Sequence, residues 1–173
     1  MDSDFYSDHS FDSGGQEELF ERLQKIKEND PYTTCLSVSE DDDYIVHMND
    51  EGWEQLGRDI ISNNTHLTDL DLYGGALNDH KMSCLFRGLL GSSSIKDMHL
   101  YGNELSVIGL RSMFPFLYNA SNLTSLYLDD NNIQSAGFNE LFRALRNSRI
   151  EKLTCDNCNI GSIEIDSEHI PKI

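Results

Sequence analysis

Apolar positions recur along the second half of the chain with a spacing of 28 residues. Segments that begin at Leu67, Ile95 and Leu123 align without a gap, and a fourth begins at Ile150 after a step of 27 residues. The aligned columns include Leu70, Met98, Leu126 and Leu153, then Leu72, Leu100, Leu128 and Cys155. Chance does not align so many columns, so the chain is predicted to consist of stacked copies of one unit.

Each unit combines two hydrophobic periodicities. The alternation leucine-x-leucine at its start predicts a short strand with one inward face. The later spacing of four, as between Leu85 and Leu89 with Phe86 beside Leu85, predicts a helix with one apolar stripe. Neither element can bury its apolar face alone, so the units must stack as a parallel sheet against a layer of helices. Pro115 is expected to kink or shorten the helix of the second unit.

These columns follow the pattern L-x-x-L-x-L-x-x-N/C-x-L, with Asn103, Asn131 and Cys158 at the N/C position. The pattern resembles the leucine-rich-repeat family, and the unit length resembles its ribonuclease-inhibitor-like (RNI-like) subclass. The resemblance implies an α/β fold: a right-handed leucine-rich-repeat solenoid, or horseshoe segment, with parallel strands on the concave side and helices on the convex side. The two asparagines are expected to turn inward and satisfy backbone groups of the loops. Gly75 departs from the pattern in the first unit.

The repeat pattern also predicts the organisation of the chain. Residues 1–15 are polar and acidic and are expected to be disordered. Residues 16–66 are expected to form an N-terminal helix and a divergent capping repeat, with a helix at 16–29, strands at 35–38 and 44–48, and a helix at 50–64. Residues 67–173 contain the repeats, which are assigned to 67–94, 95–122, 123–149 and an irregular unit at 150–173.

The end of the sequence lacks the helical pattern of the other units. After Ile160 the residues do not show an apolar stripe, and no capping repeat follows. A solenoid that stops in this way exposes the apolar side of its last unit. Truncation of a larger repeat protein is the favoured explanation. An end-to-end dimer and a partner that covers this end are the alternatives, and the oligomeric state is left open.

The acidity of the chain favours some partner classes over others. The net charge is −17, and residues 1–60 hold 17 acidic residues against four basic ones. Such a balance repels nucleic acid and anionic membranes and attracts a protein partner with a basic surface. Maintaining solubility explains the same charge at least as well. There is no signal-peptide pattern, and no stretch approaches the roughly 20 apolar residues of a membrane span. We therefore expect a cytoplasmic or nuclear protein whose four cysteines are reduced.

The outward positions of the strands are the candidate partner-binding residues. Because side chains alternate along a strand, the third, fifth and seventh positions of each unit point away from the core. They are Asp69, Asp71, Tyr73, Asp97, His99, Tyr101, Ser125, Tyr127, Asp129, Lys152, Thr154 and Asp156. Tyrosines provide large, rigid contact areas, and carboxylates beside them suit arginine or lysine. An ordinary polar surface explains the same positions, and twelve residues are fewer than the roughly 20–30 of a standard interface.

Other chemistries have weaker support. Cys155 and Cys158 have the C-x-x-C spacing of zinc and redox sites, but no second pair is present and the repeat explains both positions. Asp71, His99 and Ser125 match a catalytic triad by type, but no oxyanion donors or pocket can be named. The sequence therefore predicts a non-enzymatic protein-binding scaffold without a metal or cofactor. The alternatives are a GTPase-regulating protein of the Ran-activator type, which shares this repeat subclass, or an incomplete fragment.

Overall fold

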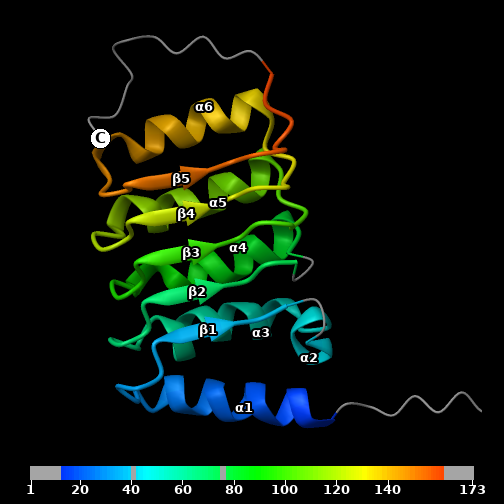
Figure 1. The fold of residues 1–173 in the computed structure, drawn as a ribbon, viewed down its shortest axis with the longest axis vertical. Coiled ribbons are helices and arrows are strands. Elements are labelled where there is room, and N and C mark those ends of the chain that lie inside the picture. The colour runs from blue at the N-terminus through cyan, green and yellow to red at the C-terminus, as the bar shows by residue number, and fades with distance from the viewer. Residues whose placement is uncertain (1–12, 40–41, 75–76, 162–173) are drawn as a thin grey trace, which may run out of the picture.

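Five short strands form one parallel sheet in the computed structural model, which describes residues 13–39, 42–74 and 77–161. They follow one another in chain order across the sheet (Figure 1). The strands are β1 (Cys35–Ser37), β2 (Asp69–Asp71), β3 (Asp97–His99), β4 (Ser125–Tyr127) and β5 (Lys152–Thr154). This order requires that the chain return to the same edge after each strand, which it does through a helical segment.

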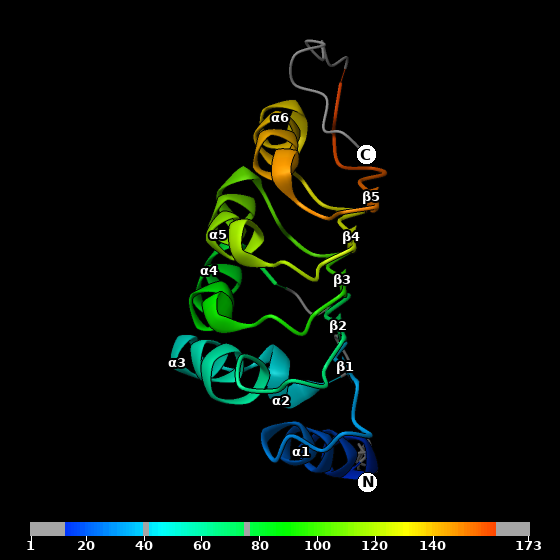
Figure 2. The ribbon, with the colours of Figure 1, turned by 90° about the vertical axis from the view of Figure 1, so that its left-hand side faces the viewer.

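The α-helices are α1 (Ser13–Lys27), α2 (Asp43–Val46), α3 (Asp50–Gln55), α4 (Asp79–Gly88), α5 (Val107–Asn119) and α6 (Gln134–Ala144). From α3 onward they form a second layer on one side of the sheet, whereas α1 lies across the end of the stack, beyond β1 (Figure 1 and Figure 2). Figure 2 shows α3 to α6 all on the same side of the strands, with no described element over the other side. None of the described helices is both long and apolar enough to cross a membrane.

The strand register confirms the alignment of the repeats. Leu70 pairs with Met98, Met98 with Leu126, and Leu126 with Leu153. The first three of these side chains are fully buried, and both strand neighbours of each are partly exposed. The predicted copies therefore lie side by side as one parallel sheet, and the alternation along each strand separates a core face from an open face.

The core lies between the sheet and the helices. Buried side chains from the helical layer include Met82, Leu85 and Phe86 of α4. Phe86 contacts Phe116 of α5 edge-to-face, with 5.4 Å between ring centroids, so it links two successive units. Trp53 of α3 is 1% exposed and brings the divergent first unit into the same core.

The inward asparagines connect adjacent units, as predicted. The Asn103 amide donates to the Leu72 carbonyl at 2.9 Å, and its oxygen accepts from the Leu77 N–H at 3.0 Å. Asn131 makes the same pair of contacts one unit later. In the next unit the Cys158 thiol donates to the Leu128 carbonyl at 3.0 Å. Gly75, the departure from this pattern, lies outside the described residues.

One predicted strand is wrong. Residues 44–48 were expected to be extended, but Asp43–Val46 form the short helix α2. Local hydrogen bonds turn the chain there, because the Asp42 side chain accepts from the Ser39 N–H at 2.9 Å and the Asp42 carbonyl from the Ile45 N–H at 2.8 Å. Ile45 is buried, and the Tyr44 ring packs on Phe20 of α1 at 4.7 Å.

Two further expectations about helices can be compared with the structure. Pro115 lies inside α5, which has 13 residues, so the helix is not shortened, and a kink at Pro115 stays a prediction. A proline inside a helix removes one backbone hydrogen bond, and Pro115 itself is exposed. The N-terminal helix begins at Ser13 rather than at residue 16. Residues 1–12 of the predicted disordered segment lie outside the described residues, and the assigned domain boundaries stay a prediction.

Two glycines allow a close helix contact between the first two units. A Cβ atom on Gly57 would lie 2.5 Å from the Leu85 carbonyl oxygen, and one on Gly88 would meet the Glu54 carbonyl and lie 2.5 Å from the Arg58 nitrogen. These are backbone atoms, which cannot rotate away. We expect Gly57→Ala to lower the free energy of unfolding by about 2 kcal/mol through overpacking.

Urea denaturation measures this change in stability. Gly161→Ala is the matched control, because its Cβ would lie 3.7 Å from the Ser135 Oγ, the nearest atom that the described residues place around it. The control is expected to stay within about 0.5 kcal/mol of the unmodified chain. Equal stability of the two variants would contradict the close contact.

Candidate functional site

The uncovered side of the sheet, called the open face below, presents three rows of side chains. The pairing register fixes the first row as Cys35, Asp69, Asp97, Ser125 and Lys152, and the second as Ser37, Asp71, His99, Tyr127 and Thr154. Backbone hydrogen bonds just after the strands extend this order to Tyr73, Tyr101, Asp129 and Asp156. None of these side chains is buried.

The structure thus places all twelve predicted residues on one surface, and it adds two. Cys35 and Ser37 of β1 continue the first two rows. The sequence predicts a strand at 35–38, but these two residues are not among the twelve predicted from the repeats. The first unit does not align with the 28-residue pattern, so its register could not be read from the sequence. Alternation around the buried Leu36 is the signal that identifies them.

Aromatic rings form a continuous strip across the open face. Tyr73 stacks on Tyr101 with 5.1 Å between centroids and 17° between planes. His99 stacks on Tyr127 at 4.3 Å and 7°, and meets the Tyr101 ring nearly edge-on at 6.4 Å. The Lys152 ammonium lies 4.8 Å from the centre of the Tyr127 ring. Each ring therefore supports its neighbour, which limits the rotamers available to all of them.

Carboxylates surround this aromatic strip. Asp71 accepts from the Ser37 hydroxyl at 3.2 Å, while its other oxygen is buried without a hydrogen-bond partner in the described part of the chain. Asp129 accepts from the Thr154 hydroxyl and, at 2.7 Å, from the Asp156 N–H. These bonds hold the carboxylates of Asp71 and Asp129 in place.

Two neighbouring carboxylates oppose each other on this face. Asp69 and Asp97 occupy directly paired positions on β2 and β3. Like charges that lie opposite each other across two strands destabilise a sheet. Within the described residues, the Asp97 side chain has neither a hydrogen bond nor an ion pair. Asp97 thus contributes a solvated negative charge without an internal partner.

The environment disfavours the charged forms of two weakly acidic groups on the open face by raising their pKa values. Burial raises the pKa of the Tyr101 hydroxyl, and the nearby Asp71 charge and Tyr73 raise it further. Burial also raises the pKa of the Cys35 thiol, with the Asp69 and Asp71 charges acting in the same direction. At neutral pH the Tyr101 hydroxyl therefore remains a hydrogen-bond donor.

The structure does not assemble the triad that was considered. Asp71 and His99 are paired across β2 and β3, whereas Ser125 is paired with Asp97. In the described part of the chain, His99 forms no hydrogen bond to Asp71 or Ser125, and its ring instead stacks on Tyr127. The arrangement therefore provides an aromatic contact and no base beside the serine.

The C-x-x-C pair lies where the repeat pattern predicts. Cys158 is 1% exposed and occupies the inward position, while Cys155 is partly buried. The hydrogen bond with Cys158, together with burial, raises the pKa of Cys155. The Cys158 thiol donates a hydrogen bond to the Leu128 carbonyl, as the inward Asn131 amide does in the preceding unit. Cys158 therefore has a structural role.

Comparisons with known proteins identify the fold. No protein-family model and no curated protein matches the chain. The solved structure of actin-binding site 2 (ABS2) of leiomodin-1 is 21% identical, with a TM-score of 0.64 over 78% of this chain and 77% of that chain. The tropomodulin C-terminal domain of Caenorhabditis elegans is 13% identical, with a TM-score of 0.61 over 88% and 86%. These similarities show a leucine-rich-repeat-like fold and not a shared activity.

Proposed function

We propose that this chain is a non-enzymatic protein-binding module whose partner docks on the open face. The stacked aromatic strip of Tyr73, Tyr101, His99 and Tyr127 is the observation that carries the proposal. Large side chains that are already ordered lose little conformational entropy when a partner binds. Tyrosine also combines an apolar ring with a polar tip, and it is enriched among the residues that dominate binding energy.

The charge of the open face favours a basic partner. Its carboxylates are Asp69, Asp71, Asp97, Asp129 and Asp156, and its basic residue is Lys152. An arginine side chain could stack on a tyrosine ring and form two hydrogen bonds with a neighbouring carboxylate. Binding would also relieve the repulsion between Asp69 and Asp97, which folding alone leaves uncompensated. We expect such a destabilising pair of like charges on a surface where the recognition of a partner requires both of them.

The solved structures suggest the first partner to test. Leiomodin-1 carries an actin-binding site on a domain of the same fold, so actin is the first candidate ligand of this chain. In this proposal the open face is the concave side of an RNI-like solenoid, and binding takes place in the cytoplasm or nucleus. The GTPase-regulating alternative makes a different prediction, which is faster GTP hydrolysis when the chain is added to a Ran-type GTPase.

The proposal predicts a large effect of Tyr101→Ala on binding. Tyr101 contacts both Tyr73 and His99, so the substitution removes one packing contact from each of these two rings. We expect the dissociation constant to increase by roughly 10-fold or more, which is typical of a residue at the centre of an interface. The measurement is a fluorescence titration with actin, or with the protein captured most strongly by the immobilised chain.

Tyr118→Ala is the matched control for this measurement. Tyr118 is 67% exposed and lies on α5, on the helical side of the sheet. The same residue type is removed there without touching the open face. The control is expected to bind as tightly as the unmodified chain. If Tyr101→Ala also binds as tightly for every partner found, the open face is not the docking surface.

A further inference from the structure

A second cluster of reactive side chains lies among the helices, away from the open face. Asp50 is the first residue of α3, and His80 and Cys84 lie one turn apart on α4. Their ligand atoms all lie within 4.8 Å of one another. The His80 Nε2 atom and the Asp50 carboxylate are already in contact at 2.8 Å. Residues from two successive units therefore converge on one point.

We propose that Asp50, His80 and Cys84 form a binding site for one zinc ion, with water as the fourth ligand. Carboxylate oxygen, imidazole nitrogen and thiolate sulfur are the three ligand types that zinc takes in proteins. The thiolate disfavours magnesium and calcium, which prefer oxygen ligands. Two ligands four residues apart on a helix share one face, a spacing that recurs in zinc sites. The inference is independent of the proposed partner binding.

The geometry requires only a small movement to complete the site. Zinc bonds of roughly 2.0–2.3 Å place tetrahedral ligand atoms about 3.3–3.7 Å apart. The side chains of Asp50 and His80 are 63% and 68% exposed, so both can rotate toward the ion. Cys84 is fully buried, so its sulfur is the ligand atom with the least freedom to move. Rotation of the two exposed side chains can widen the 2.8 Å contact between His80 and Asp50 and shorten their distances to the sulfur.

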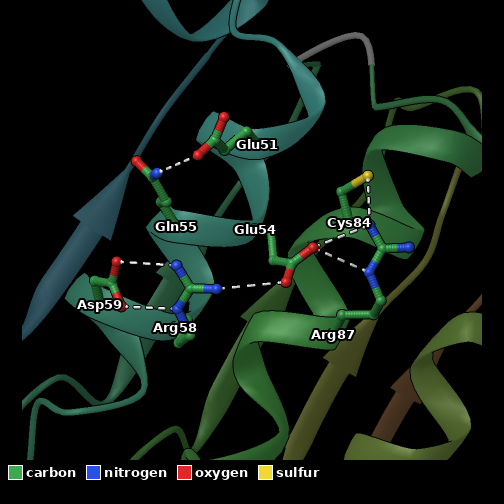
Figure 3. Close-up of polar contacts among 7 residues, drawn as sticks. All are labelled: Glu51, Glu54, Gln55, Arg58, Asp59, Cys84 and Arg87. Carbon is green, nitrogen blue, oxygen red and sulfur yellow. Dashed lines mark hydrogen bonds and ion pairs between the residues drawn. The ribbon is translucent and has the colours of Figure 1, made fainter.

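The surroundings of Cys84 also suit a metal ligand. The Arg87 guanidinium donates to the Cys84 sulfur at 3.2 Å (Figure 3). Glu54 of α3 holds Arg87 in turn, with 3.1 Å between the charged groups. Such partners behind the ligands orient them and are a regular part of zinc sites.

A simpler explanation accounts for part of the cluster. His80 and Asp50 form an exposed contact that needs no metal, because pairs of this kind are common on protein surfaces. That contact does not explain why a buried cysteine with a guanidinium donor faces the same point. The chain also has a rival thiol pair, Cys155 and Cys158, so the test must separate the two locations.

Cobalt titration of the full chain tests the proposal. Co²⁺ occupies zinc sites and reports a thiolate ligand through charge-transfer absorption, and added Zn²⁺ should displace it. We expect one Co²⁺ per chain with this absorption. His80→Ala should weaken Co²⁺ binding by more than about 100-fold. Loss of a residue that only supports a metal ligand weakens binding by roughly 10–100-fold, so a larger effect indicates that His80 is itself a ligand. Cys84→Ser should abolish the absorption.

Two control variants decide between the outcomes. His66→Ala removes another exposed histidine, and Cys155→Ser removes a thiol of the rival pair; both are expected to bind Co²⁺ as the unmodified chain does. The His80 and His66 variants change surface side chains, so they decide the question even if Cys84→Ser unfolds. The proposal is overturned if the unmodified chain gives no thiolate absorption, if His80→Ala binds as well as His66→Ala, or if the signal requires Cys155.

Discussion

Phe116→Ala is expected to lower the free energy of unfolding by about 4 kcal/mol, the largest effect of any change considered for this chain. Phe116 is 1% exposed and packs edge-to-face on Phe86 of the preceding unit. Its removal leaves a cavity between α4 and α5, because the strands and the neighbouring helices hold these two helices in place. The surroundings cannot collapse into the space, so both the transfer energy and the packing contacts are lost.

Chemical denaturation monitored by circular dichroism measures this loss. Tyr118→Ala on the same helix is the control, because its ring is 67% exposed and buries little area. It is expected to remain within about 0.5 kcal/mol of the unmodified chain. A stack of units depends on the contacts between neighbours, so the Phe116 variant is also expected to unfold over a broader range of denaturant. Similar midpoints for the two variants would show that this contact does not couple the units.

The second large effect is expected for Asn131→Ala, at about 3 kcal/mol. Asn131 is 3% exposed; its oxygen accepts from the Leu105 N–H at 3.1 Å, and its amide donates to the carbonyls of Leu100 at 2.8 Å and Leu128 at 2.9 Å. Its amide also donates to the Asp129 carbonyl at 3.2 Å. Alanine removes all four bonds and leaves a buried backbone donor unsatisfied. Each such group costs roughly 1–3 kcal/mol.

Two further variants make this prediction specific. Asn131→Cys is expected to lose less stability than Asn131→Ala, because Cys158 already donates to a carbonyl at the equivalent position. Asn139→Ala changes an exposed asparagine of α6 and is expected to be nearly neutral. If thermal unfolding gives the same midpoint for Asn131→Ala and Asn139→Ala, the inward asparagines do not hold the units together.

Several features of the open face could be predicted from the repeats alone. Asp71, His99 and Tyr127 were assigned to one row before their pairing was known, and the register confirms that row. The alignment of equivalent positions suffices, because stacked copies place like positions side by side. The role of these residues in binding stays a prediction. Cys35 was not assigned to the same face, since the first unit differs in length from the others.

Sequence alone determined the repeat, the parallel order of its strands and, from Leu67 onward, the side of the sheet on which the strand residues lie. These properties follow from local alternation and from a constant spacing, which do not depend on the details of packing. Only the tertiary structure decided that Asp43–Val46 is helical, that the rings of Tyr73 and Tyr101 stack, and that the ligand atoms of Asp50 and Cys84 lie within 4.8 Å of each other. Those outcomes depend on the offset and rotation of one unit against the next, and side-chain packing between layers sets both.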